Sequence, residues 1–222
     1  MRPLPAVAAA LLAALALPLV GCRGAGSSEV AKADPAATRP AGPRLGTDPG
    51  GVGKGTPLVA RPSRELAAFA GGCFWGTEDT FRNVPGVVAT AVGYTGGHTK
   101  DPTYEEVCSH TTGHAEAVLV EYDPTKVSYE ALVATFFKSH DPTTLDRQGP
   151  DVGDQYRSEV FTFSEAQAAV VRDAIAREQA RRGRRVVTKV SAIGAFYKAE
   201  EYHQQYDEKT GRHSCALPVH TD

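Results

Sequence analysis

Short apolar runs alternate with amphipathic stretches along residues 64–222 of this chain. Five of the runs predict β-strands, because each is short, mostly apolar and bounded by Gly, Pro, Asp or Ser. No internal repeat is apparent, so the pattern predicts a single domain rather than a repeat array. The five predicted strands are Leu66–Ala70, Val87–Tyr94, Ala117–Tyr122, Glu159–Phe163 and Val186–Ile193.

Two segments between these runs predict helices. Apolar residues recur at helical spacing over Tyr129–Phe137, behind Ser128 as the N-cap. Ser164 and Gln167 have the spacing of a capping box at the start of an Ala-rich helix that ends near Gly183. Strands and helices that alternate with mixed connections predict an α+β protein built as a two-layer sandwich. In the second helix, the residues expected to face the core are Val170, Val171 and Ile175.

The start of the chain resembles an export signal. Residues 1–21 carry Arg2 and then an apolar stretch from Ala6 to Val20, which is too short to span a membrane and predicts a signal peptide. Leu19–Cys22 resembles a bacterial lipoprotein cleavage site, so we expect a mature chain that begins at a lipidated Cys22. Secretion without a lipid is the alternative. The expected location is a membrane surface that faces the periplasm or the cell exterior.

Residues 22–63 are dominated by Gly, Ala, Pro, Ser and Thr and contain few large apolar side chains. Such a segment cannot bury enough surface to fold, so we expect a flexible linker before a domain over residues 64–222. The whole chain is 41% hydrophobic and 23% charged, with a net charge of −2, which is ordinary for a globular protein. It has no basic stripe, so nucleic acid is not an expected partner. We expect a monomer.

Gly71–Gly76 contains the strongest chemical signal. Cys73 lies between the predicted strand Leu66–Ala70 and a helix-like run that begins at Phe74. Two glycines permit a tight turn, and the unpaired N–H groups of a first helical turn stabilise an anion. We therefore expect the pKa of Cys73 to lie below its free value of about 8.5. Phe74 and Trp75 would wall a pocket for a methyl or thioether group. The alternative is an inert, buried cysteine.

This hexapeptide resembles the motif of the type A peptide methionine sulfoxide reductases, and the similarity continues over most of residues 64–222. Six further blocks follow in the order of that family, which makes the resemblance specific. It implies a ferredoxin-like βαββαβ core with long loops, reduction of the S epimer of methionine sulfoxide, free or in proteins, and no bound cofactor. The six blocks are Gly93–Gly97, Thr103–Ser109, Thr112–Glu116, Ser139–Pro142, Asp154–Ser158 and Tyr202–Tyr206.

The resemblance also implies a catalytic cycle through two cysteines. Cys73 attacks the sulfoxide and becomes a sulfenic acid, Cys215 condenses with it to a disulfide, and a thioredoxin-like reductant restores both thiols. Cys215 follows a polar tail, Asp207–Ser214, that we expect to be mobile. Without the resemblance, the cysteines of an exported protein would also fit one structural disulfide and a spare thiol.

A sulfoxide oxygen must be protonated to leave, so the site needs an acid and hydrogen-bond donors. Glu116 is the candidate acid, because the apolar strand that it opens would raise its pKa; an exposed glutamate at a strand end is the alternative. Tyr104 and Tyr156 are the candidate donors, and tyrosines at the edge of the core are the alternative. Asp151 and Tyr206 are predicted to support the substrate site.

Cys108 is predicted to be a partly buried residue without an obligatory role, with a second resolving thiol as the alternative. Cys108, His110 and His114 are close in sequence, but a fourth ligand is not evident, so we expect no metal site. His110 also stands where the family usually has Gly, which could shift the loop that leads to Glu116.

Two other classes of function compete with the reductase. One is a lipid-anchored thiol peroxidase or thiol–disulfide oxidoreductase that uses Cys73 and Cys215. The absence of a Cys-x-x-Cys pair argues against the oxidoreductase, and the apolar pair Phe74 and Trp75 favours a methyl-bearing substrate over a peroxide. The other class is a binding module with a structural disulfide, which would keep its ligand in a Cys73→Ser variant.

Overall fold

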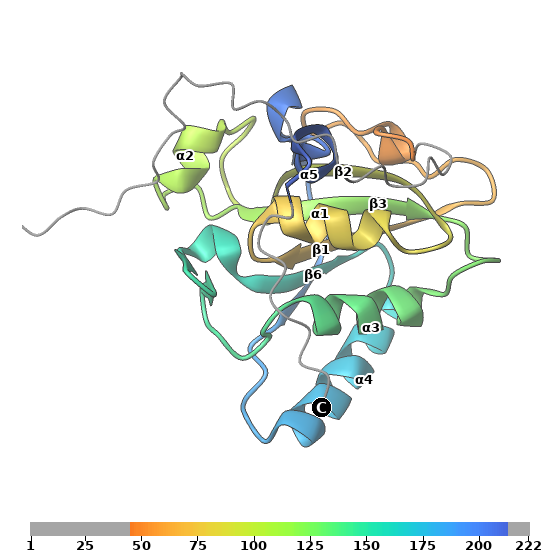
Figure 1. Ribbon diagram of the computed structural model, residues 1–222, viewed down its shortest axis with the longest axis vertical. Helices are drawn as coiled ribbons and strands as arrows, with labels where there is room; N and C mark the ends of the chain where they lie inside the picture. Colours follow the sequence, from red (N-terminus) through yellow and green to blue (C-terminus); the bar gives the residue numbers. More distant parts are fainter. Residues whose placement is uncertain (1–44, 213–222) are drawn as a thin grey trace, which may run out of the picture. The chain divides into compact units, whose positions relative to one another are not determined.

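A six-stranded sheet forms the centre of residues 45–212, which are the residues that the computed structural model describes (Figure 1). The strand order is β7-β6-β1-β3-β2-β8, and all neighbours are antiparallel except β6 and β7. The strands are β1 (Glu65–Gly71), β2 (Val87–Thr95), β3 (Ala115–Tyr122), β6 (Ser158–Thr162), β7 (Lys189–Ala192) and β8 (Phe196–Lys198).

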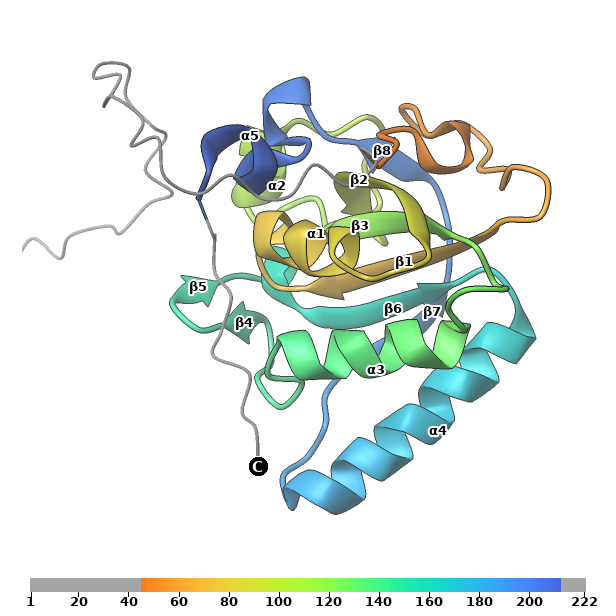
Figure 2. The same ribbon diagram turned by 45° about the vertical axis from the view of Figure 1, so that its right-hand side comes forward.

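Three helices cover one face of this sheet, as Figures 1 and 2 show. They are α1 (Phe74–Arg82), α3 (Tyr129–Ser139) and α4 (Glu165–Arg182). The shorter elements lie in the connections and near the two ends of the described chain. They are η1 (Pro49–Gly51), α2 (Tyr104–Cys108), the hairpin β4 (Arg147–Gln148) and β5 (Asp151–Val152), η2 (Asp154–Tyr156), η3 (Glu201–His203) and α5 (Tyr206–Thr210).

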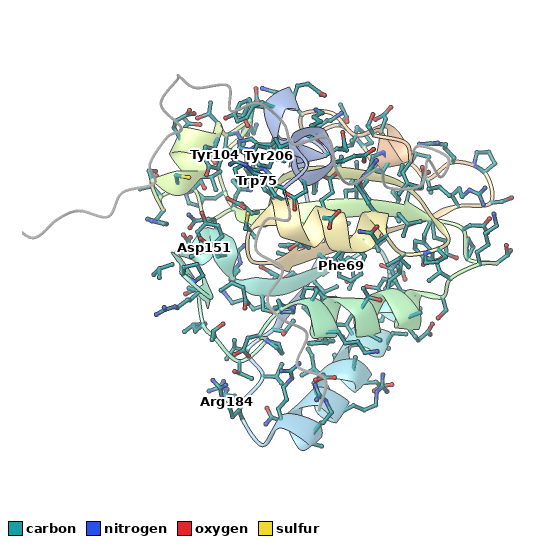
Figure 3. All side chains as sticks on the ribbon, in the orientation of Figure 1. Phe69, Trp75, Tyr104, Asp151, Arg184 and Tyr206 are labelled. Carbon is teal, nitrogen blue, oxygen red and sulfur yellow. The ribbon has the colours of Figure 1, made fainter. Side chains whose placement is uncertain are left out.

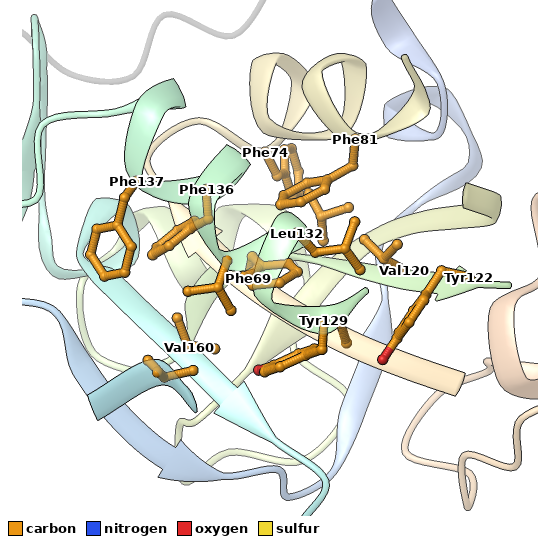
Figure 4. Packing of buried hydrophobic residues seen from close by; sticks show 14 of the residues in the cluster. Phe69, Phe74, Phe81, Val120, Tyr122, Tyr129, Leu132, Phe136, Phe137 and Val160 are labelled. Atoms are coloured by element: carbon orange, nitrogen blue, oxygen red, sulfur yellow. The ribbon is translucent and has the colours of Figure 1, made fainter. Parts of the chain in front are cut away.

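The main hydrophobic core lies between the sheet and the three helices. Phe69 of β1 is at its centre, stacked on Phe81 of α1 at 4.5 Å and on Phe136 of α3 at 5.3 Å between ring centroids (Figure 4). Val171 of α4 belongs to the same buried cluster. Each fully buried side chain of this size contributes about 1.5–3 kcal/mol to folding, so this cluster fixes the sheet against the helices.

The opposite face of the sheet carries smaller side chains. Residues 45–63, which contain no long helix, cover it. Alternation along β1 points Ala68 and Ala70 to this face, where Val52 also packs. Arg61 anchors the segment, since its backbone N–H and its guanidinium contact the buried Glu121 carboxylate at 2.7 and 3.0 Å. Residues 45–63 therefore lie against the domain, in contrast to the flexible linker predicted over residues 22–63. Their small side chains fit closely against an alanine-rich sheet face.

All five predicted strands and both predicted helices are confirmed within a few residues. Ser128 caps α3 by accepting the Ala131 N–H, and Gly183 ends α4 with a left-handed φ of 62°. Only half of the predicted capping box is present. The Ser164 side chain accepts the Gln167 N–H, as in a capping box. The Gln167 side chain, however, accepts the N–H of Phe163 and not that of Ser164. The short strand β8 and the hairpin β4–β5 were not predicted, because two- or three-residue strands carry no periodic signal.

The C-terminal segment is more ordered than its polar sequence predicts. We expected a mobile tail from Asp207, but Asp207–Thr210 lies within α5 and Asp207 is buried. Glu208 forms an ion pair of 2.7 Å with Arg82 of α1, which ties α5 to the domain. Cys215 and Cys22 lie outside the described residues. Within residues 45–212, no helix has the length and apolar character needed to cross a membrane.

Candidate active site

Cys73 lies where the sequence predicts it, between the last residue of β1 and the first residue of α1. It is the N-cap of α1, and its side chain is half-buried. The preceding Gly72 has a φ of 99°, and a Cβ atom at this position would lie 2.7 Å from the Gln148 side chain. Glycine is therefore required at this turn. The turn places the thiol at the positive end of the helix dipole, which stabilises a thiolate.

Glu116 is distant from Cys73 in the sequence, but its side chain reaches the same N-terminal end of α1. It is the second residue of β3, its exposed fraction is 2%, and its Oε2 accepts the backbone N–H of Phe74 at 3.0 Å. A buried strand thus carries a carboxyl group to the first turn of α1, next to Cys73. Glu116 is therefore buried, and the alternative of an exposed glutamate at a strand end is wrong.

Tyr104 and Tyr156 belong to the same group of side chains. The pKa of Tyr104 is raised above its ordinary value by burial and then by the nearby Glu116 and Cys108, with Tyr156 also within electrostatic range. The hydroxyl of Tyr104 is hydrogen-bonded to Cys108, one turn along α2. Tyr156 ends η2 and is 9% exposed. Tyr104 therefore keeps its proton at neutral pH and is a hydrogen-bond donor beside Glu116.

Trp75 forms an aromatic wall with residues from the C-terminal segment. Its indole stacks on Tyr206 with ring centroids 3.9 Å apart and an interplanar angle of 10°. Phe74 is buried next to it, with its ring centroid 6.3 Å from that of Trp75. Figure 3 shows Trp75, Tyr104 and Tyr206 close together at the end of the molecule where α1 begins. The structure therefore brings together Phe74 and Trp75, which were predicted to form an apolar wall, and Tyr206, which was predicted to support the site.

His203 and Glu200 belong to this site but were not assigned a role from the sequence. His203 accepts the indole N–H of Trp75 on its Nδ1 at 3.1 Å. Glu200 accepts the hydroxyl of Tyr94 at 2.9 Å and the backbone N–H of Tyr104 at 3.0 Å. The block Tyr202–Tyr206 was a signal for His203, but only the folded chain shows what its ring contacts.

Asp151 lies on β5 of the hairpin β4–β5, in backbone register with Gln148, whose side chain contacts the turn at Gly72. The hairpin therefore lies beside the Cys73 turn (Figures 2 and 3). His110, which stands where the family usually has Gly, has a left-handed φ of 60°, and its Nδ1 lies 2.9 Å from Gln155 Oε1. The loop accommodates the histidine by this contact. Within residues 45–212, no three His, Cys, Asp or Glu side chains are grouped so that they could hold a metal.

A thiol at a helix N-terminus, next to a buried carboxyl group and an aromatic wall, is the arrangement of enzymes that react through a cysteine thiolate. A family model described as Peptide methionine sulfoxide reductase matches residues 65–222. The peptide methionine sulfoxide reductase MsrA of Methanothermobacter thermautotrophicus is 55% identical over 155 residues, covering 69% of this chain and 92% of that protein. MsrA of Methanosarcina mazei is 57% identical over 150 residues, covering 66% of this chain and 71% of that protein.

Solved structures are similar as well. Mxr1 from Saccharomyces cerevisiae in reduced form superposes with a TM-score of 0.67 at 38% identity, covering 70% of this chain and 91% of Mxr1. Methionine sulfoxide reductase A of Corynebacterium diphtheriae gives a TM-score of 0.64 at 34% identity, covering 80% of this chain and 94% of that protein. The chain belongs to the peptide methionine sulfoxide reductase family. It is an oxidoreductase that reduces methionine sulfoxide.

Proposed function

We propose that the enzyme reduces the S epimer of methionine sulfoxide, free or in proteins, with Cys73 as the nucleophile and Glu116 as the acid. The observation that carries this proposal is the hydrogen bond of 3.0 Å from the Phe74 N–H to Glu116, which holds a buried carboxyl group beside the cysteine. Acid and nucleophile at one helix end are what an attack on a sulfoxide needs.

In the proposed reaction the thiolate of Cys73 attacks the substrate sulfur, and Glu116 gives a proton to the sulfoxide oxygen. Tyr104 and Tyr156 donate hydrogen bonds to this oxygen as its negative charge grows. The oxygen moves to Cys73, which becomes a sulfenic acid, and methionine leaves. The substrate sulfur is reduced by two electrons and the cysteine sulfur is oxidised by two.

The methyl group of the substrate binds against the wall of Phe74, Trp75 and Tyr206. The stacked pair of Trp75 and Tyr206 supports this assignment, because two parallel rings 3.9 Å apart present a rigid apolar surface. Asp151 supports the site from the hairpin beside Gly72. A bare peroxide would not use such a wall, so the structure favours the reductase over the thiol peroxidase.

The recycling step would use Cys215. Its thiol condenses with the sulfenic acid of Cys73 to a disulfide and releases water, and a thioredoxin-like dithiol then reduces the disulfide by exchange. This part of the proposal rests on the family resemblance and on the position of Cys215 after α5, which is fixed near α1 through Arg82 and Glu208. Cys108 has a different place in the proposal, as the partner of the Tyr104 hydroxyl.

We interpret the fold as a ferredoxin-like core with additions. The units β1-α1-β2 and β3-α3-β6 follow each other along the chain, and their strands form the central order β6-β1-β3-β2 with antiparallel neighbours. Strands β7 and β8 extend the sheet at its two edges.

We also propose that the enzyme is exported and held at a membrane by a lipid on Cys22. The apolar stretch of residues 1–21 and the Leu19–Cys22 sequence support this proposal. Mass spectrometry of the mature N-terminus tests it: a diacylated Cys22 is expected. An unmodified Cys22, or a chain that starts downstream of it, would contradict the anchor.

The test of the reaction is the reduction of separated S and R epimers of a methionine sulfoxide peptide by the chain without its first 22 residues, with dithiothreitol as reductant. This form keeps residues 45–63, which pack on the domain. Turnover of the S epimer alone, lost in Cys73→Ser, is expected. Turnover of the R epimer, or full activity of Cys73→Ser, would refute the mechanism, and consumption of peroxide alone would favour the peroxidase.

A further inference from the structure

Exposed large apolar side chains gather around the opening of the site. Within residues 45–212, four such side chains are exposed, with fractions from 56% to 71%. Val152 belongs to the hairpin β4–β5, Leu145 lies in the turn that leads into it, and Tyr202 belongs to η3 beside the aromatic wall. The fourth, Val59, lies outside this region. Single exposed apolar residues are normal on a protein surface, whereas a group of them beside a site marks a contact surface.

The hairpin β4–β5 is held firmly against the turn at Gly72. The Gln148 side chain accepts the Asp141 N–H at 2.9 Å and donates to the Asp141 carbonyl at 3.1 Å. The same side chain packs against Gly72. At the other end of the hairpin, the Gly153 N–H donates to the Asp146 carbonyl at 2.9 Å. The hairpin is therefore a preorganised rim of the site, which binds a partner without a large ordering cost.

The pairing of the two short strands decides which of their side chains face the site. Gln148 pairs with Asp151, and Arg147 pairs with Val152. Neighbouring residues of a strand point to opposite faces, so Val152 faces away from Gln148 and from the turn. Val152 is accordingly 62% exposed, and Leu145 is 64% exposed. Two apolar side chains thus lie on the outer surface of the rim, close to Asp151.

The rim continues from the hairpin to the aromatic wall through the loop after α2. A Cβ atom at Gly153 would lie 2.4 Å from the His110 ring, so the end of the hairpin touches this loop. At the start of α2, the Tyr104 ring lies 4.6 Å from that of His203 between centroids. Tyr202 packs on the same His203 ring at 4.0 Å. Exposed apolar side chains are therefore present at both ends of one continuous rim.

A methionine sulfoxide within a polypeptide brings its neighbours to this rim. Its side chain has to enter the site between Cys73 and the aromatic wall, so the backbone on either side of it passes over the rim. Apolar neighbours would cover Leu145 and Val152 and release water from both surfaces, which favours binding. Free methionine sulfoxide has no such neighbours.

We propose that Leu145 and Val152 form a subsite for apolar residues that flank methionine sulfoxide in a polypeptide, with Tyr202 as the opposite boundary of the rim. This inference rests on the proposed function and names its preferred substrate, which is methionine sulfoxide in an apolar segment. Such segments are buried in folded proteins and become accessible when a protein unfolds. The subsite therefore directs the enzyme to oxidised proteins that have lost their fold.

The test compares two pentapeptides with methionine S-sulfoxide at the centre, one flanked by leucines and the other by alanines. Dithiothreitol is the reductant, and the chain lacks its first 22 residues. The wild-type enzyme should have a kcat/KM about tenfold higher for the leucine peptide, mainly through a lower KM. The double variant Leu145→Ser/Val152→Ser should reduce this ratio to about two or less. Equal kcat/KM values for the two peptides in the wild-type enzyme, or the wild-type ratio in the double variant, would overturn the proposal.

Val59→Ser is the matched control, because it also removes an exposed apolar side chain. The Val59 N–H donates to the Gly50 carbonyl, and Gly50 lies against Leu66 near the start of β1, whereas Cys73 follows the end of this strand. This variant should keep the wild-type ratio between the two peptides. An equal fall of the ratio in Val59→Ser would contradict a specific subsite at the hairpin.

Other occupants of this surface give different results. If it bound a thioredoxin-like reductant, the double variant would keep the peptide ratio and lose activity only when thioredoxin replaces dithiothreitol. If it bound a second copy of the chain, gel filtration would show a wild-type dimer and a monomeric double variant, again with an unchanged ratio. Either result would overturn the proposal.

The comparison of the two peptides with the wild-type enzyme needs no variant, so it remains decisive if the double variant does not fold. Reduction of both peptides with equal kcat/KM would refute the subsite and leave the proposed function intact. Reduction of neither peptide would refute the proposed function, and the subsite with it.

Discussion

Phe74 and Glu116 are joined by a hydrogen bond of 3.0 Å that connects the first turn of α1 to the start of β3. This bond brings a carboxyl group to the residue that follows Cys73, the proposed nucleophile. It also satisfies one of the N–H groups that a helix leaves unpaired at its N-terminus. One contact thus serves the local structure of the turn and places the proposed acid beside the proposed nucleophile.

Glu116→Gln tests the role of the acid. The amide oxygen can still accept the Phe74 N–H, so the turn should be preserved, but the amide cannot supply a proton to the sulfoxide oxygen. We expect kcat to fall about 10²- to 10⁴-fold with a much smaller change in KM, measured with the S epimer. Glu105→Gln, an exposed carboxylate on α2, is the matched control. A kcat within threefold of the wild-type value in Glu116→Gln would exclude it as the acid.

Gly72→Ala tests the turn before Cys73. The left-handed φ of 99° and the close approach of Gln148 both oppose a Cβ atom at this position. We expect a loss of about 1–3 kcal/mol in the free energy of unfolding, together with reduced activity, because the thiol is displaced. Urea unfolding measures the first effect. Gly194→Ala is the control, since no atom would lie within 4 Å of its new methyl group; equal midpoints for both variants would show that the turn tolerates a side chain.

Gln204→Ala tests how the C-terminal segment is held. The Gln204 side chain is fully buried and pairs with both backbone groups of Val92 and with the Ala199 carbonyl, each at 2.9 Å. Its removal takes this partner from the Val92 N–H and the Ala199 carbonyl, whereas the Val92 carbonyl still accepts the Ala199 N–H at 3.0 Å. A buried group left unsatisfied costs about 1–3 kcal/mol. We expect a lower urea midpoint and a shifted Trp75 emission, because His203 and Tyr206 flank this anchor. An unchanged midpoint would mean that α5 alone holds the segment.

The stability of the enzyme should fall on the acid side of neutrality through His140. Burial lowers the pKa of this residue to about 4, from 6.5 in an unfolded chain. Between these values the unfolded chain binds the extra proton, so the stabilisation is complete above about pH 6.5 and is lost as the pH falls toward 4. The loss should reach about 3 kcal/mol. Urea unfolding at pH 7, 5.5 and 4 measures it. His140→Asn should remove this share of the loss and leave that of His203, whose pKa burial also lowers to about 4; a parallel profile in the variant would assign the loss to other groups.

Patterns of neighbouring residues in the sequence predicted the longer strands and helices. The strands β1, β2, β3, β6 and β7 and the helices α3 and α4 follow from runs of apolar residues and from caps within a few positions of each end. The hairpin β4–β5 and the strand β8 could not be found in this way, because strands of two or three residues carry no periodic signal; β8 is held by its pairing with the distant strand β2. The sequence also did not predict that residues 45–63 are ordered, because their side chains are buried only by packing against the sheet.

The sequence by itself determined that a thiol stands at a strand-to-helix turn, because two glycines, a cysteine and two aromatic residues in a row specify that geometry locally. Only the tertiary structure decided what surrounds the thiol. Glu116 arrives through the register of β3, and His203 arrives through the anchor at Gln204. Such contacts depend on strand pairing and packing between distant segments, and one-dimensional spacing does not encode those distances.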